Sequence, residues 1–264
     1  MDIVALYFLA GCAAGLCGGL LGMGGGIIVV PVLATLFAMQ PIAEPLVMPL
    51  ALGTSLASVV FTSLCSMRAH HRRGTVNWQL VRQIAPGLII GATLGGLLSA
   101  YCSSAALKVF FLMFAIIAAT QMLRAHPPLV TRTLPGTAPL VAVGGAIGGI
   151  ASLVGCGGAT IAVPFMTRCA VPMRNAVGSA SAFGLPVALT GTMVYMVSGL
   201  DKVGLPAMSL GYVHLPALLA ITVGSACAVP LGAALSHKLP VAVLKKCFAL
   251  MLYAMAGKML MAVL

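Results

Sequence analysis

Charged residues are scarce in this chain of 264 residues, and acidic ones are the scarcest. Only 6% of the residues are charged, and three of these are acidic: Asp2, Glu44 and Asp201. Soluble domains carry about 25% charged residues, so the composition excludes an ordinary soluble domain. No carboxylate lies deep in an apolar segment, which argues against a carboxylate proton relay or an acid-based sodium site. Glu44, His214 and His237 are the candidates for any coupling to protons.

Catalytic signatures are missing as well. The chain has no HExxH sequence, no pair of membrane aspartates for intramembrane proteolysis, and no identifiable nucleophile–base pair. Its eight cysteines form no CxxC pair and no zinc-site spacing, and we expect most of them to act as small hydrophobic residues. The sequence therefore predicts a protein that is not an enzyme and that uses no metal and no cofactor.

Long apolar runs make up most of the sequence. Hydrophobic residues make up 61% of the chain, and they gather in runs of about 20 residues, the length that crosses a hydrocarbon core. A polar linker with prolines separates two groups of four runs, which cover 3–39, 45–67, 82–101 and 105–123, then 138–169, 173–199, 210–236 and 241–263. This pattern predicts an all-α polytopic protein of a cell inner membrane, with the lipid bilayer as its surroundings.

The two groups of runs repeat each other. Seven residues from Gly15 to Pro31 recur after a shift of 133 positions, and five residues from Gly87 to Lys108 recur after a shift of 137. ALGTS at 51–55 matches AVGSA at 176–180. We therefore predict a first membrane repeat at 1–124, a linker at 125–137 and a second repeat at 138–264.

The basic residues indicate how the repeats are oriented. The 14 lysines and arginines give a net charge of +11 and lie between apolar runs, which favours cytoplasmic loops over a nucleic-acid-binding surface. If each glycine-broken run is a hairpin that enters and leaves on one side, eleven basic residues fall inside and three outside. Eight separate crossings would give eight inside and six outside. The positive-inside rule favours the first arrangement, which predicts inverted repeats, each opening with a glycine-broken, re-entrant helix.

Two dense glycine runs interrupt apolar segments, at GLLGMGGGIIVVPVL (19–33) and SLVGCGGATIAVPFM (152–166). Glycine costs about 1 kcal/mol relative to alanine inside a helix. The backbone groups that a break frees are tolerated only within protein or a water-filled cavity. We expect new helices to begin near Gly25 or Gly26 and near Gly158 or Ala159, each directing N–H groups and about half a positive charge at the break. Paired breaks of this kind mark substrate sites in transporters, so the runs predict a site for a small anion.

Close helix packing is the alternative explanation of the glycines. GxxxG spacings let helix backbones approach each other. We assign the spaced glycines to packing and only the dense runs to breaks; the spaced set is Gly11, Gly15, Gly19, Gly87, Gly91, Gly95, Gly144 and Gly148.

Hydroxyl, thiol and cationic side chains complete the candidate substrate site. The hydroxyls that follow each break either donate to an oxyanion or bond backward to their own helix. Cys156 stands where the first half has Met23, and Arg174 either reaches the site or extends to the membrane interface. The full candidate set is Gly22, Met23, Gly24, Gly25, Gly26, Thr54, Ser55, Gly155, Cys156, Gly157, Gly158, Arg174, Ser179 and Ser181.

The paired glycine runs with a proline downstream, the GTS motif at 53–55 and the four-plus-four duplication resemble the TauE/SafE family, also called the TSUP family. The resemblance covers nearly the whole chain. It implies an inner-membrane carrier that exports a small sulfur-containing anion such as sulfite, sulfoacetate or a related organosulfonate. The second run reads GCGGAT and AVGSA replaces GTS, so the two half-sites differ and the anion is left open.

Alternating access, with one repeat rocking against the other, is the transport mechanism that an inverted-repeat carrier predicts. A passive anion channel and a non-transporting membrane subunit are the alternatives. The sequence gives neither the coupling ion nor the oligomeric state.

Overall fold

The computed structural model describes residues 3–21, 25–123 and 134–236, together with 246, 249–250, 252–254 and 256–257. Gly22, Met23 and Gly24 of the candidate site lie outside the described residues, as do most of the predicted linker and most of the predicted last segment at 241–263.

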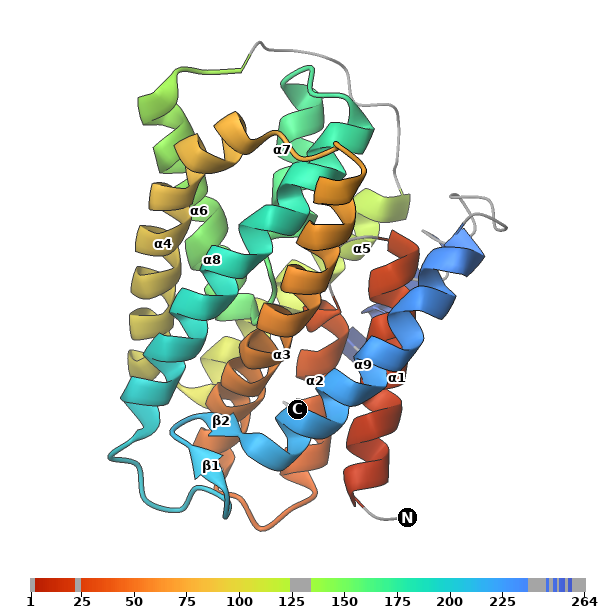
Figure 1. The fold of residues 1–264 in the computed structure, drawn as a ribbon. Coiled ribbons are helices and arrows are strands. Elements are labelled where there is room, and N and C mark those ends of the chain that lie inside the picture. Colours follow the sequence, from red (N-terminus) through yellow and green to blue (C-terminus); the bar gives the residue numbers. More distant parts are fainter. Residues whose placement is uncertain are drawn as a thin grey trace.

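Helices make up most of the described chain (Figure 1). Five of them are long and apolar enough to cross a membrane: α3, α4, α5 from Ser104 to Gln121, α6 and α8. This confirms an all-α, multi-pass membrane protein. The elements are α1 (Ile3–Leu21), α2 (Gly26–Ala38), α3 (Glu44–Arg72), α4 (Trp78–Tyr101), α5 (Ser104–Leu123), α6 (Thr137–Val154), α7 (Ala159–Arg168), α8 (Met173–Gly199), β1 (Ser209–Leu210), β2 (Val213–His214) and α9 (Leu215–Ser236).

The two glycine-broken segments fold back on themselves. Gln40, just after α2, donates from Nε2 to Tyr7 Oη on α1 at 2.7 Å, so the start of α1 and the end of α2 lie at one end of the molecule. In Figure 1, α6 descends from the opposite end and α7 returns to it. Each segment therefore enters the bundle and leaves it at the same end.

Two glycine seams join the halves of the chain. α1 packs parallel to α9, and α4 packs parallel to α6. A Cβ added at Gly15 would lie 2.6 Å from Ser225 O, one at Gly144 would lie 2.6 Å from Ile84 O, and one at Gly91 would overlap Gly145 O. Backbone packs against backbone along both seams. The packing assigned to the spaced glycines is confirmed at Gly11, Gly15, Gly87, Gly91, Gly95, Gly144 and Gly148.

α3 and α8 cross antiparallel at the centre of the bundle (Figure 1). The beginning of α3 lies against the end of α8, because a Cβ at Gly53 would lie 3.1 Å from Tyr195 Cβ. The loop after α3 lies against the beginning of α8, because a Cβ at Gly178 would lie 2.5 Å from Thr75 O. The middle of α3 is buried on nearly every side, so this helix is the core around which the others pack.

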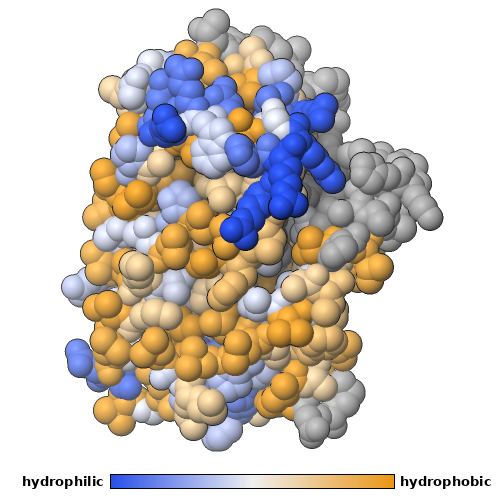
Figure 2. Space-filling view, in the orientation of Figure 1, coloured by the Kyte–Doolittle hydropathy of each residue, from blue (hydrophilic) through white to orange (hydrophobic). Residues whose placement is uncertain are grey.

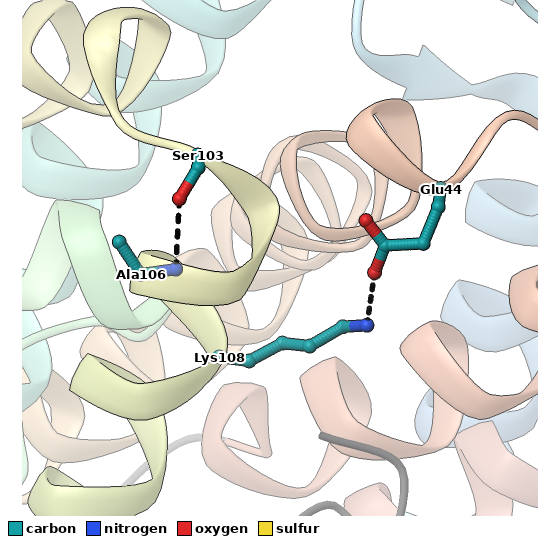
Figure 3. Close-up of polar contacts among 4 residues, drawn as sticks. All are labelled: Glu44, Ser103, Ala106 and Lys108. Carbon is teal, nitrogen blue, oxygen red and sulfur yellow. Dashed lines mark hydrogen bonds and ion pairs between the residues drawn. The ribbon is translucent and has the colours of Figure 1, made fainter. Parts of the chain in front are cut away.

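The two ends of the bundle differ in the charged residues that they carry. The end of α3, the beginnings of α4 and α8 and the end of α7 carry the arginines of the described chain, and hydrophilic surface gathers at this end above an apolar middle (Figure 2). At the opposite end, Lys108 on α5 forms an ion pair with Glu44 in the first turn of α3 (Figure 3). Beside it, Ser103 Oγ accepts from Ala106 N at 3.2 Å and caps α5. Among the described residues, the arginines therefore gather at one end of the bundle, and the Glu44–Lys108 pair lies at the other.

A short hairpin replaces the beginning of the run predicted at 210–236. β1 and β2 pair Ser209 with His214 and Leu210 with Val213, and α9 begins only at Leu215. Gly211 turns the chain with a φ of +55°, and a Cβ there would overlap Met196 O. The apolar composition of this segment concealed the turn, because hydropathy does not separate a buried hairpin from a helix.

Candidate functional site

The two glycine breaks touch each other at the centre of the bundle. Gly26 is the first residue of α2, and a Cβ added there would lie 2.8 Å from Gly155 O and 3.1 Å from Cys156 Cα. These residues are 129 positions apart in the sequence. α2 begins at Gly26 and α7 at Ala159, which confirms both predicted helix starts. The contact unites the two dense glycine runs in one place.

Glycine conformation makes the second break. Gly155 ends α6 with a φ of +72°, and Gly158 precedes α7 with a φ of +75°. Side chains other than that of glycine rarely adopt this left-handed region. Cys156 N donates to Ala151 O at 2.9 Å, which closes the end of α6, and Gly158 O accepts from Ile161 N and Ala162 N at the start of α7. The chain thus reverses between two helices within four residues.

Helix N-termini face each other across the contact. The first amides of a helix have no partner within it; in the part of the chain that the structure describes, these are the amides of Gly26 and Ile27 on α2 and of Ala159 and Thr160 on α7. α2 and α7 leave the contact in opposite directions (Figure 1), so their N-termini point toward one another. Each terminus carries about half a positive charge. The C-terminus of α6, at Gly155, lies in the same contact and carries about half a negative charge, so the positive end of each dipole acts only on a group placed directly before the first amides of α2 or α7.

Ser55 links the two breaks. Its Oγ donates to Gly155 O at 2.8 Å and lies 3.2 Å from Gly26 O, and the residue is fully buried. One hydroxyl proton is therefore shared between a carbonyl of each break. In this conformation Ser55 positions the backbone and has no proton left for a ligand.

Thr54 and Ser179 instead anchor the beginnings of two helices. Thr54 Oγ1 accepts from His214 N at 3.0 Å, and Ser179 Oγ accepts from Asn77 N at 3.0 Å. His214 Nδ1 caps α9 by accepting from Ala217 N at 3.3 Å, as Asn77 Oδ1 caps α4 by accepting from Leu80 N at 3.1 Å. His214 lies 137 positions after Asn77, the shift that relates the two halves in this region. The same anchor therefore occurs twice, each time between different halves.

Thr54→Val is expected to destabilise the protein more than Ser179→Ala. Valine keeps the shape of threonine but leaves the buried His214 N–H unpaired, at a cost of about 1–3 kcal/mol. The Asn77–Ser179 bond is only partly buried, so water can replace the lost acceptor. Thermal unfolding of the purified variants measures the difference. Ser181→Ala is the control, because Ser181 Oγ only donates back to Gly178 O at 2.7 Å; equal losses from all three changes would contradict the anchor.

The remaining candidates divide between the contact and the periphery. Cys156 is 3% exposed and lies at the contact, and Gly157 adjoins it with its Cβ position 3.2 Å from Gly184 Cα. Arg174 is exposed at the beginning of α8. The structure thus brings together Gly25, Gly26, Ser55, Gly155, Cys156, Gly157 and Gly158, and it places Thr54, Ser179, Ser181 and Arg174 in other surroundings.

Ser152, Asn77 and His214 are the residues of this region that sequence patterns left out of the site. Ser152 is fully buried one turn before Gly155, and its Oγ has no hydrogen-bond partner among the described residues. Tyr195 Oη donates to Ser152 O at 3.4 Å. The first half has Gly19 at the position of Ser152, so the repeat comparison passes over it. The shift of 137 would have paired Asn77 with His214.

Sequence comparison identifies the family of the chain. The family model described as "Sulfite exporter TauE/SafE" matches residues 7–259. The chain belongs to the TauE/SafE family. Among its TauE/SafE-like relatives, a probable membrane transporter protein of Haemophilus influenzae is 36% identical over 262 residues, which are 97% of each chain. The probable membrane transporter protein YunE of Bacillus subtilis is 30% identical over 226 residues, 75% of this chain and 80% of YunE. No solved structure matches the chain.

Proposed function

We propose that this TauE/SafE-family protein is a carrier that exports a small sulfur-containing anion, such as sulfite, sulfoacetate or a related organosulfonate, across the inner membrane. The observation that carries the proposal is the contact of the two glycine breaks, where the N-termini of α2 and α7 face each other beside Ser55. The name of the family supplies the class of anion. No lysine or arginine is buried among the described residues, so the backbone amides at the two breaks would hold the anion.

Inverted repeats are part of this proposal. The helices that correspond under the sequence shifts run in opposite directions: α3 against α8, and the α1–α9 pair against the α4–α6 pair (Figure 1). An axis in the membrane plane relates such halves in many carriers, with the substrate site near the bilayer midplane. The contact between Gly26 and Gly155, near the centre of the bundle, supports a site of this kind. By the positive-inside rule, the arginine-rich end faces the cytoplasm.

Alternating access would open the contact first to one end and then to the other. The repeats are interlocked, since each glycine seam contains one helix from each half. One whole repeat therefore cannot rock as a rigid body against the other without breaking the seams. We propose that the paired helices α1–α9 and α4–α6 move as units around the central α3 and α8.

Thermal stabilisation of the purified full chain by anions tests the function. A ligand that binds only the folded protein stabilises it by about 2.7 kcal/mol at a hundredfold excess over its Kd. We expect one sulfur oxyanion from a panel of sulfite, sulfate, thiosulfate and sulfoacetate to raise the Tm, with chloride and acetate as controls. If no anion raises the Tm selectively, the proposed anion site is wrong.

Counterflow in proteoliposomes separates a carrier from a channel. The anion that stabilises the protein is loaded unlabelled inside vesicles, and uptake of the same labelled anion is followed from outside. In a carrier, unlabelled anion inside the vesicles accelerates the uptake of labelled anion from outside. A passive channel shows no such stimulation. If the uptake rate does not depend on the internal anion, the protein is a channel and not a carrier.

A further inference from the structure

His214 lies at the junction of several elements at the end of the bundle opposite the arginines. Its ring centroid is 5.9 Å from that of Tyr7 on α1 and 5.6 Å from that of Phe37 on α2, both edge-on. Its backbone N–H donates to Thr54 on α3, and its Nδ1 accepts from Ala217 N on α9. The residue is only 7% exposed. Four helices therefore meet on this one histidine.

The cap on α9 requires a neutral ring. Because Nδ1 accepts a hydrogen bond from a backbone amide, the ring proton is on Nε2. A second proton would occupy Nδ1, so the ring could no longer accept and the amide of Ala217 would lose its partner. Burial lowers the pKa of His214 below its usual value of 6.5, because the packed ring has little water to solvate a charge.

No described charge offsets a protonated ring at this position. The titratable groups on the adjoining elements are Tyr7 on α1, Tyr195 on α8 and Tyr212 in the hairpin turn, all neutral phenols near pH 7. The loop from α8 to β1 adds Asp201 and Lys202, which are both exposed and form no ion pair with His214 among the described residues. α2 carries no titratable side chain. On α3, the nearby end has only Glu44, which is paired with Lys108. The charged ring is therefore stable only where water can reach it.

The corresponding anchor at the other end does not titrate. Asn77 caps α4 and donates its backbone N–H to Ser179, as His214 caps α9 and donates to Thr54. An asparagine amide keeps the same hydrogen bonds at every physiological pH. The two ends of an otherwise matched network thus differ in their response to protons.

Two consecutive residues of α3 connect the histidine to the contact of the glycine breaks. Thr54, which accepts from His214, directly precedes Ser55, which joins Gly26 O and Gly155 O. Both lie on the same rigid turn of α3. A displacement at His214 therefore reaches the proposed anion site through two consecutive residues.

We propose that His214 is a proton-operated latch that holds the end of the carrier opposite the arginines closed while neutral and releases it when protonated. The meaning of this release for transport rests on the proposed function; the latch itself is a property of the folded chain. One proton is taken up on Nδ1, and one backbone hydrogen bond, to Ala217, is lost. Acid on that side of the membrane then favours the conformation that is open to it.

Hydrogen–deuterium exchange of the full chain in lipid nanodiscs at pH 5 and pH 8 tests the latch without any substrate. After correction for intrinsic rates, we expect the amides of 213–220 to exchange faster in acid, by about tenfold for each pH unit below the pKa of ~6.5 of an opened ring. The amides of 77–83, around the matching asparagine, are the internal control and keep their protection.

Two exchanged caps complete the test. His214→Asn gives α9 the cap of α4 and is expected to remove the acid response at 213–220. Asn77→His places a histidine cap at an exposed position, where water stabilises the charged ring, and is expected to give a smaller acid response at 77–83. Unchanged protection at 213–220, an equal acid response at both ends of the wild-type protein, or an acid response retained in His214→Asn would each overturn the latch. Because no anion takes part, such a result leaves the proposed function to its own tests.

Discussion

Gly91→Ala is expected to prevent the protein from folding stably. The new Cβ would overlap the carbonyl oxygen of Gly145 on the facing helix, which is backbone and cannot rotate away. The seam between α4 and α6 would have to open along its length. Overpacking within a core costs about 1–3 kcal/mol even when side chains can adjust, and the cost here is expected to reach or exceed about 3 kcal/mol. The yield of monodisperse protein and its Tm in detergent measure the effect.

Gly145→Ala on the same seam is the matched control. Its Cβ would have only Gly87 O within 4 Å, at 3.9 Å, an ordinary van der Waals contact. Alanine also favours a helix over glycine by about 1 kcal/mol, so this variant is expected to be at least as stable as the wild type. Equal behaviour of the two variants would show that the seam is not as tight as the backbone contacts require.

Gly26→Ala is expected to abolish anion transport while leaving a folded protein. A methyl group there would lie 2.8 Å from Gly155 O and 2.9 Å from Val59 Cγ2, so it pushes the two breaks apart. These distances are longer than that between a Cβ at Gly91 and Gly145 O, so small shifts of Val59 and of the break can accommodate the methyl group. In enzymes a misplacement of about 1 Å lowers rates about 10²-fold, and we expect a loss of similar size in counterflow.

Gly136→Ala makes the same chemical change where there is room for it. Gly136 precedes α6, and a Cβ there would meet nothing within 4 Å in the described structure. We expect wild-type counterflow from this control. If Gly26→Ala keeps a flux within twofold of the wild type, the contact of the breaks is not part of the transport path.

The neighbouring hydroxyls of Thr54 and Ser55 have different roles. Thr54 and Ser55 are consecutive, yet one accepts from the beginning of α9 and the other donates to both breaks. The second half has Ser179 at the position of Thr54 but Ala180 at that of Ser55. The link therefore comes from one half only. The two halves thus differ in their hydrogen bonding at this position.

Local features of the chain were predictable because their cost is local. A glycine run inside an apolar segment breaks a helix wherever that segment lies, so the starts of α2 at Gly26 and of α7 at Ala159 followed from the sequence. The spaced glycines indicated close backbone packing for the same reason. The lack of charge and the length of the runs determined the membrane class.

Only the tertiary structure decided which groups meet and which protons are free. A serine in a membrane helix has one hydroxyl proton, and its partner depends on carbonyls brought from distant positions, as those of Gly26 and Gly155 are brought to Ser55. Hydropathy could not reveal the hairpin before α9, since a buried turn is as apolar as a helix. The sequence by itself determined where the backbone breaks; long-range packing determined that the two breaks touch.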